Sequence, residues 1–150
     1  MTPTVFRGRY NHTIDEKGRI SFPAKISQIF AEQYDHSMVI TGWGRHLLVF
    51  PYEEWAALEA KVSQQSIIRK EIRAFQRFFM SNAVDCTLNH QRRVLIPPAL
   101  REYARLEKEV VILGMVRTVE IWNRELLEAE MAKIDESSED FADYVADLGI

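Results

Sequence analysis

Basic side chains recur in the same order, each time beside an acidic or amide side chain, in two short stretches of the sequence. The first stretch places Asp15 four positions before Arg19, and the second places Asn89 four positions before Arg93. Between these residues lie Lys17 and Gly18 in the first stretch and Gln91 and Arg92 in the second. An arginine can donate two hydrogen bonds to one guanine or hold a phosphate, and a lysine can reach either target. The two stretches are therefore candidate contacts for a polyanion such as DNA.

The two stretches are copies of one motif. Both read threonine, apolar, aspartate or asparagine, three variable residues, arginine, apolar, any residue, apolar, proline. Arg93 follows Arg19 at an offset of 74 positions (93 − 19 = 74), and Pro97 follows Pro23 at the same offset. The likeness continues through the apolar segments downstream. Each half is therefore predicted to run strand, turn, strand, short helix, strand, turn, strand.

Each motif is predicted to be a hairpin. In the first, Ile20 and Phe22 alternate with the polar Ser21 beside a turn signal, and in the second, Val94 and Ile96 lie on one face before Pro97. The residues predicted to face the core are Ile14, Ile20, Phe22, Leu88, Val94 and Ile96. Asp15 and Gly18 signal the first turn. The second turn has Arg92 in place of the glycine. Asn89 tolerates positive φ and keeps an oxygen acceptor, but it lacks the charge that would pair with Arg93.

The remaining segments are mostly predicted helices. A strand is expected over residues 5–10, with Arg7 and Arg9 on one face, and helices over residues 24–34, 51–65, 67–80 and 124–148. The helix over 67–80 is expected to present one apolar stripe, made of Ile68, Ile72, Phe75 and Phe79. Arg69, Arg73 and Arg77 line another face, where ion pairs within or between subunits are favoured over contact with DNA. The last helical region has few apolar residues with which to dock beyond Ser138.

A repeat of this size cannot close a core alone, so the halves are expected to cover each other's strand edges. The predicted fold is α+β, mainly β with helices: two tandem repeats intermesh in one β-barrel core with peripheral helices. Residues 5–80 are expected to form the first repeat with the linking helices. Residues 81–150 are expected to form the second repeat with an acidic C-terminal helix.

Composition favours a soluble globular chain, with 47% hydrophobic and 27% charged residues and no apolar run of membrane-spanning length. Residues 125–150 carry nine acids and one base, a sum of −8, which leaves +5 on the rest of the chain. A basic body with an acidic tail is compatible with binding a polyanion. The single cysteine and the lack of an N-terminal apolar signal favour a cytoplasmic location.

Catalysis and metal binding find little support in the sequence. His12, His36, His46 and His90 lack metal-ligand spacing, and Cys86 fits a small buried residue in a strand. Ser21 and Ser27 lack the context of a nucleophile elbow. We therefore expect no enzyme activity, no cofactor, no metal and no small-molecule substrate.

The motifs in combination resemble the MraZ family of AbrB-like, swapped-hairpin transcriptional regulators. The resemblance rests on residues 5–10, 15–19 with Pro23 and Ala24, 73–79, and 93–101. It implies a regulator that binds double-stranded promoter DNA, at short tandem repeats upstream of the division and cell-wall gene cluster. It also implies assembly into homo-oligomeric rings, and hence a place on the nucleoid. The expected DNA-binding residues are Lys17, Arg19, Arg93, Arg92 and Gln91, with Arg7 and Arg9 extending the surface, while Asp15, Asn89 and Gly18 orient the turns.

Two other readings stay open. One is a non-catalytic scaffold or ring protein, in which basic loops pair with the acidic tails of neighbouring copies. The other is an enzyme built on a small β-barrel. Asp15 and Arg19 alone could also be no more than a surface ion pair, which contributes about 0–1 kcal/mol. Duplication of this polar pair favours binding over that reading.

Overall fold

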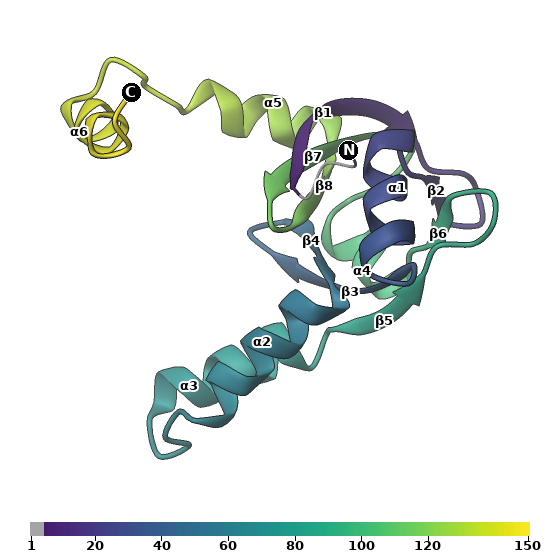
Figure 1. Cartoon of the computed structure of the whole chain (residues 1–150), viewed down its shortest axis with the longest axis horizontal. Coiled ribbons are helices and arrows are strands. Elements are labelled where there is room, and N and C mark those ends of the chain that lie inside the picture. The colour runs from purple at the N-terminus through teal and green to yellow at the C-terminus, as the bar shows by residue number, and fades with distance from the viewer. Residues whose placement is uncertain (1–4) are drawn as a thin grey trace.

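The computed structural model describes residues 5–150, and its elements repeat in the predicted order (Figure 1). The first half contains β1 (Phe6–Thr13), β2 (Arg19–Ser21), α1 (Ala24–Gln33), β3 (Ser37–Trp43) and β4 (His46–Pro51). The second half contains β5 (Val84–Thr87), β6 (Arg93–Leu95), α4 (Pro98–Tyr103), β7 (Glu109–Val116) and β8 (Val119–Asn123). Between the halves lie α2 (Tyr52–Ser63), α3 (Lys70–Phe75) and the π-helix η1 (Gln76–Met80), and the chain ends with α5 (Arg124–Ala132) and α6 (Glu139–Asp147).

The two halves exchange strands across one six-stranded sheet. Its order is β1-β7-β8-β4-β3-β5, a palindrome once each strand is replaced by its counterpart in the other half. β1 pairs antiparallel with β7, from Phe6 opposite Val116 to Thr13 opposite Glu109. Equivalently, β5 pairs with β3, and β4 joins β8 at the centre. Because the outer strand on each side comes from the other half, neither half completes its sheet alone.

The strand that follows each motif turn also pairs across the halves. β2 and β6 form a separate two-stranded ribbon with Ile20 opposite Val94, and these side chains are 0% and 1% exposed. All the apolar motif residues predicted to face inward lie in the main core: Ile14, Ile20, Phe22, Leu88, Val94 and Ile96. The predicted α+β fold of intermeshed repeats is confirmed. The motifs are not self-contained hairpins, because the first keeps only one bridge of its own, Ile14 to Ile20.

The linking helices form an arm that leaves the body of the molecule (Figure 1). The predicted helix over 67–80 begins only at Lys70, so placing Ile68 in its apolar stripe is wrong. The Arg73 Nη1 donates to the carbonyls of Ile67 at 2.6 Å and Ile68 at 2.8 Å, which holds this loop outside the helix. Ile68 is consequently 84% exposed at the tip. At the base of the arm, Phe79 packs in a small core of its own.

The arginines of this arm differ in their partners. Arg69 approaches Glu71 at 3.9 Å, as an ion pair on an exposed surface. Arg73 is occupied by the two loop carbonyls rather than by a carboxylate. Arg77 forms no ion pair with another described residue, 5–150. Within the described part of this chain, an ion pair is therefore present for Arg69 alone, and pairing of the other two between subunits stays a prediction.

The C-terminal region is two helices, not the single helical region predicted over 124–148. α5 docks on the sheet through Leu127, which packs with Val111 and Trp122. α6 buries none of its residues, and Figure 1 shows it held away from the body. Phe141 and Leu148 are 44% and 59% exposed. The apolar residues expected to dock this tail therefore do not dock on their own chain.

Candidate functional site

The first motif loop is organised by the carboxylate of Asp15. Its Oδ1 accepts hydrogen bonds from the backbone N–H groups of Lys17 at 2.9 Å and Arg19 at 2.8 Å. Its Oδ2 accepts from the Arg19 Nε at 2.8 Å. The hydrogen bond from the Arg19 backbone, joined by that from its guanidinium, lowers the pKa of Asp15 below its usual range. Asp15 thus fixes the turn and the direction of Arg19 together.

The second motif loop has the same backbone without the carboxylate or the glycine. The Asn89 Oδ1 accepts from the backbone N–H groups of Gln91 at 2.9 Å and Arg93 at 3.0 Å. Arg92 takes the place of Gly18, with φ values of +61° and +87° respectively. The acceptor that an amide shares with a carboxylate is therefore sufficient for this turn.

Arg93 differs from Arg19 in the group that its side chain binds. It donates through Nη2 to the Gln91 Oε1 within the same loop, because Asn89 offers it no negative charge. Both motif arginines are half-buried, whereas Gln91 and Arg92 are exposed. Gln91 therefore takes the orienting role that Asp15 has in the first loop.

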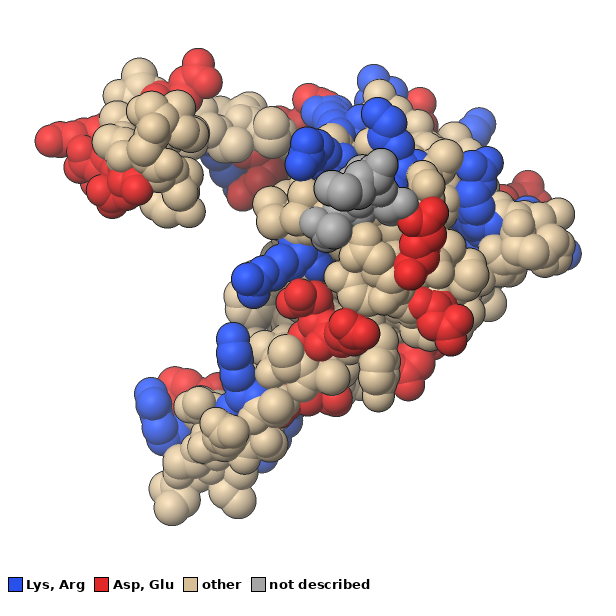
Figure 2. Space-filling view, viewed as in Figure 1, with Lys and Arg blue, Asp and Glu red and all other residues tan. Residues whose placement is uncertain are grey.

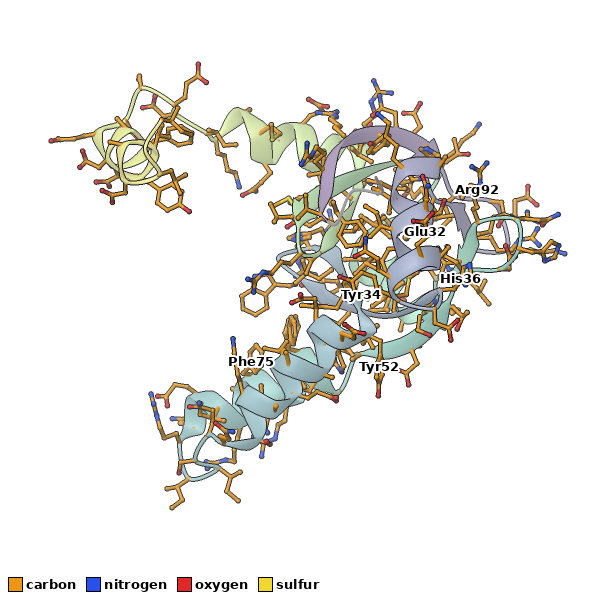
Figure 3. All side chains as sticks on the ribbon, viewed as in Figure 1. Glu32, Tyr34, His36, Tyr52, Phe75 and Arg92 are labelled. Carbon is orange, nitrogen blue, oxygen red and sulfur yellow. The ribbon has the colours of Figure 1, made fainter. Side chains whose placement is uncertain are left out.

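The two loops lie side by side at one end of the molecule. The Gly18 carbonyl accepts from the Ile96 N–H, and the Arg92 carbonyl accepts from the Phe22 N–H, both at 2.8 Å. These bonds are equivalent under the repeat, so the two turns brace each other. Figure 1 shows the loops at the end opposite α6, and Figure 3 labels Arg92 on that same side. The residues brought together at this end are Lys17, Arg19, Gln91, Arg92 and Arg93.

Arg7 and Arg9 lie on β1, which starts the first motif. Both are exposed, but the Arg9 Nη2 is bound to the Glu128 Oε1 of α5. The hydrogen bond from Arg9 lowers the pKa of Glu128, so this carboxylate stays charged near neutral pH. Arg9 is therefore partly neutralised. Arg7 keeps a free cationic head among the described residues.

Charge is distributed unevenly along the long axis of the molecule. Figure 2 shows the acidic side chains of α6 at one end and lysines and arginines over the body around β1 and α1. α6 has Glu139 and Asp140 in its first turn and no base in its last turn. Because α6 lies at the end opposite the motif loops, it does not neutralise the loops of its own chain.

The described part of the chain has no cluster of metal ligands, no membrane-spanning helix and no ionised thiol near neutral pH. Within residues 5–150, no cluster of three or more His, Cys, Asp or Glu side chains could hold a metal ion. No helix there is long and apolar enough to cross a membrane. Cys86 is only partly buried, and that burial, aided by the charge of Asp85, raises the pKa of its thiol to about 11. The thiol therefore stays protonated near neutral pH.

One basic residue at this end was not singled out by the motif pattern. Arg101 of α4 packs over Gly18 so closely that a Cβ built on Gly18 would lie 2.6 Å from the Arg101 Cζ. The only local signal is a basic residue shortly after the second proline of a motif. Its position over the other motif depends on the strand exchange, which local spacing does not reveal.

These features define a class of protein: an intermeshed two-repeat domain that presents a pair of braced, arginine-bearing loops. A family model described as "MraZ protein, putative antitoxin-like" matches the chain twice, over residues 5–78 and 79–147. The chain belongs to the MraZ family.

Relatives at full length agree with this assignment. A protein named "Transcriptional regulator MraZ" from Thermoanaerobacter sp. (strain X514) is 42% identical over 147 residues, covering 97% of this chain and 100% of the relative. Proteins of the same name from Moorella thermoacetica and Syntrophobacter fumaroxidans are 42% and 37% identical. The Moorella match covers 97% of this chain and the Syntrophobacter match 100%, and both span 100% of the relative.

Proposed function

We propose that this chain is a sequence-specific, DNA-binding transcriptional regulator that reads promoter DNA with its two motif loops. The observation that carries the proposal is the pair of braced turns, which hold two arginines on one surface. Full-length similarity to proteins named transcriptional regulators supports it. The proposed reading residues are Lys17, Arg19, Gln91, Arg92 and Arg93, with Arg7 and Arg9 extending the basic surface along β1 and Asp15, Gly18 and Asn89 as orienting residues. The proposed role requires no catalysis, and it places the chain in the cytoplasm on nucleoid DNA.

The two-loop surface is suited to reading because its backbone is fixed before binding. Each turn is held by an aspartate or asparagine acceptor and by a backbone bond to the opposite motif. A prearranged loop loses little conformational freedom on binding. The exposed side chains of Lys17 and Arg92 then supply charge that no described carboxylate neutralises.

We also propose that residues 5–80 and 81–150 are two sequence repeats. They are not separate folding units in this proposal, because the two halves share one fold.

The first test compares charge removal at a loop with charge removal elsewhere. Lys17→Ala combined with Arg19→Ala should weaken binding to DNA from upstream of the chain's own gene, relative to a scrambled duplex. A lost base contact should relax specificity by about 1–3 kcal/mol, while a lost phosphate contact should lower the salt slope by about one. Arg117→Ala, an exposed arginine in the β7–β8 turn, is the control. Unchanged affinity in the double variant would remove the first loop as a reader.

We also propose that the chain acts as a homo-oligomer, with a ring as the arrangement, on short tandem repeats. Exposed apolar residues on both projecting parts support assembly. α6 carries Phe141, Tyr144, Val145 and Leu148 along one face, and the tip of the arm exposes Ile67 at 68%. An amphipathic helix that finds no partner on its own chain can bury this face on a neighbour.

Assembly and recognition of repeats are tested separately. Phe141→Asp combined with Leu148→Asp should reduce the mass measured by light scattering, whereas Ala146→Asp on the polar side of α6 should not. Duplexes with one, two and three repeats should show affinity that rises steeply with number, because linked sites raise avidity by about 10²–10⁴. A monomer that binds one repeat as tightly as three would end the ring proposal but leave DNA binding by single loops intact.

A further inference from the structure

Arg101 is built into the first motif loop although it comes from the second half of the chain. A Cβ at Gly18 would lie 2.6 Å from its Cζ, 2.7 Å from its Nε and 2.9 Å from its Nη1. The guanidinium therefore fills the space that a side chain at position 18 would need. α4 carries Arg101 into this place because Pro97, at the end of the second motif, starts the helix next to the first loop.

The charge of Arg101 has no partner in the described part of the chain. Within residues 5–150, no carboxylate lies within 4.0 Å of its guanidinium, and its Nε is buried without a hydrogen-bond partner. An arginine does not lose its proton at any physiological pH. A partly buried, unpaired cation is unfavourable unless an anion or other acceptor approaches it. Beside a loop that reads DNA, the acceptor that fits is a phosphate oxygen.

Two more arginines line the open groove that runs from Arg101 along α4. The groove has a volume of about 880 Å³ and includes Arg45 and Arg105. Arg45 is steadied by Tyr103: its guanidinium lies 5.4 Å from the ring centroid, and its backbone N–H donates to the Tyr103 hydroxyl at 3.1 Å. Glu102 and Glu107 also line the groove, but neither comes within ion-pairing distance of these arginines among the described residues. Within residues 5–150, none of the three guanidinium groups along the groove forms an ion pair with a carboxylate.

α1, the helix that is equivalent to α4 in the other half, differs at these positions. At the offset of the motif repeat, the counterparts of Arg101 and Arg105 are Ser27 and Ala31 of α1, neither of which is basic. Arg92 occupies the second loop where Gly18 occupies the first. An arginine therefore covers the first loop of the pseudo-symmetric pair, whereas the equivalent helix position in the other half is the short, uncharged Ser27.

We propose that Arg101, with Arg105 and Arg45 along the groove, binds a backbone phosphate of the DNA strand next to the bases read by the first loop. This inference rests on the proposed function. A phosphate contact on one side gives the loop pair a direction on the duplex, although its backbone is nearly twofold symmetric. An asymmetric contact of this kind lets a protein bind successive DNA sites in the same orientation. A twofold-symmetric surface would favour palindromic sites instead.

The test separates charge from packing at position 101. Arg101→Met keeps an unbranched stem over Gly18 but removes the charge, and Arg101→Lys keeps the charge. Fluorescence anisotropy is measured on promoter and scrambled duplexes between low and moderate salt, with melting temperature recorded for each variant. Arg117→Met is the matched control. We expect Arg101→Met to weaken binding about tenfold on both duplexes, the size of one lost charge-assisted hydrogen bond. Its salt slope should fall by about 0.9, the value for one phosphate.

Arg101→Lys should keep the wild-type salt slope, and the Met variant should melt within a few degrees of wild type. Wild-type binding by Arg101→Met would overturn the inference and leave the proposed function in place. Equal losses of affinity and melting temperature in the Met and Lys variants would also overturn it, because they would show a packing role. A wild-type protein that binds promoter and scrambled DNA alike would instead defeat the proposed function, and the inference with it.

Discussion

The two motif loops have one backbone conformation and two sets of side chains. In the first, a carboxylate holds Arg19 and a glycine occupies the left-handed position. In the second, an amide holds the same turn, an arginine occupies that position and Gln91 orients Arg93. Neither the charge nor the glycine therefore sets the turn. The side-chain oxygen and the backbone bonds between the loops are common to both.

A glycine is favoured at position 18 for a second reason that does not apply at position 92. Left-handed φ favours glycine at both positions, but only Gly18 is covered by a guanidinium. At the second loop the residue equivalent to Arg101 is Ser27, which is short. The second loop thus has its bulky residue, Arg92, at the left-handed position itself, and it has no basic residue at the position equivalent to Arg101.

The largest effect on stability is expected in the β2–β6 ribbon, where strands from the two motifs pair over the core. Ile20→Asp and Val94→Asp each place an unpaired charge in a fully buried position, and each should destabilise the fold by on the order of 4 kcal/mol or more. Since typical domains have only about 5–15 kcal/mol, both variants should be largely unfolded by circular dichroism. Leu95→Asp on the same ribbon is the control, because Leu95 is 58% exposed. Cooperative melting at the wild-type temperature in Ile20→Asp or Val94→Asp would contradict the shared core.

A smaller effect on stability should appear when the first loop receives the residues found at the equivalent positions of the other half. Gly18→Arg should destabilise the chain by about 1–3 kcal/mol, from left-handed strain and from collision with Arg101. In an Arg101→Ser background the collision is removed, so the same change should be less unfavourable by at least about 0.5 kcal/mol. Urea unfolding of the two single variants, the double variant and wild type measures this coupling. Simple additivity of the two changes would show that the loops do not compensate in this way.

Restoring the acid of the second loop should have a modest effect. Asn89→Asp keeps both backbone hydrogen bonds and offers Arg93 the partner that Arg19 has, so stability should change by about 0–1 kcal/mol. If Arg93 contacts DNA, affinity should stay level or rise, because the guanidinium is held as in the first loop. Anisotropy on the promoter duplex measures this, with Asp15→Asn as the mirror variant. A large loss of affinity would show that the added charge repels phosphate and that the amide is preferred.

The smallest difference is expected in how the stability of the fold depends on pH in the acid range. The pKa of Asp15 is lowered in the folded chain, so its stabilising effect is complete above its unfolded pKa near 3.8 and is lost as pH falls through its folded pKa. Asn89 does not titrate in that range. Stability measured between about pH 2 and 6 should therefore fall less steeply in Asp15→Asn than in wild type, below about pH 4. Parallel curves for the two proteins would mean that the ion pair has no net effect on folding.

Local pattern was sufficient to predict the repeat, the buried motif residues and the order of strands and helices. Ile20 and Phe22 are separated by the polar Ser21, and Val94 and Ile96 repeat the same two-residue spacing, which places each pair on one face whatever its partner is. The motif turns were equally readable, because Asp15 and Asn89 act on residues two and four positions away. These are short-range interactions, so the chain encodes them within a few residues.

The tertiary structure alone decided which groups meet across the halves. Strand exchange brings Arg101 onto Gly18 and Glu128 onto Arg9, over separations that no periodicity reports. It also decided where α3 begins: Arg73 binds the carbonyls of the preceding loop, and that contact excludes Ile68 from the helix predicted for it. The physical reason is that long-range contacts depend on how two imperfect repeats dock, whereas each repeat by itself specifies only its own faces and turns.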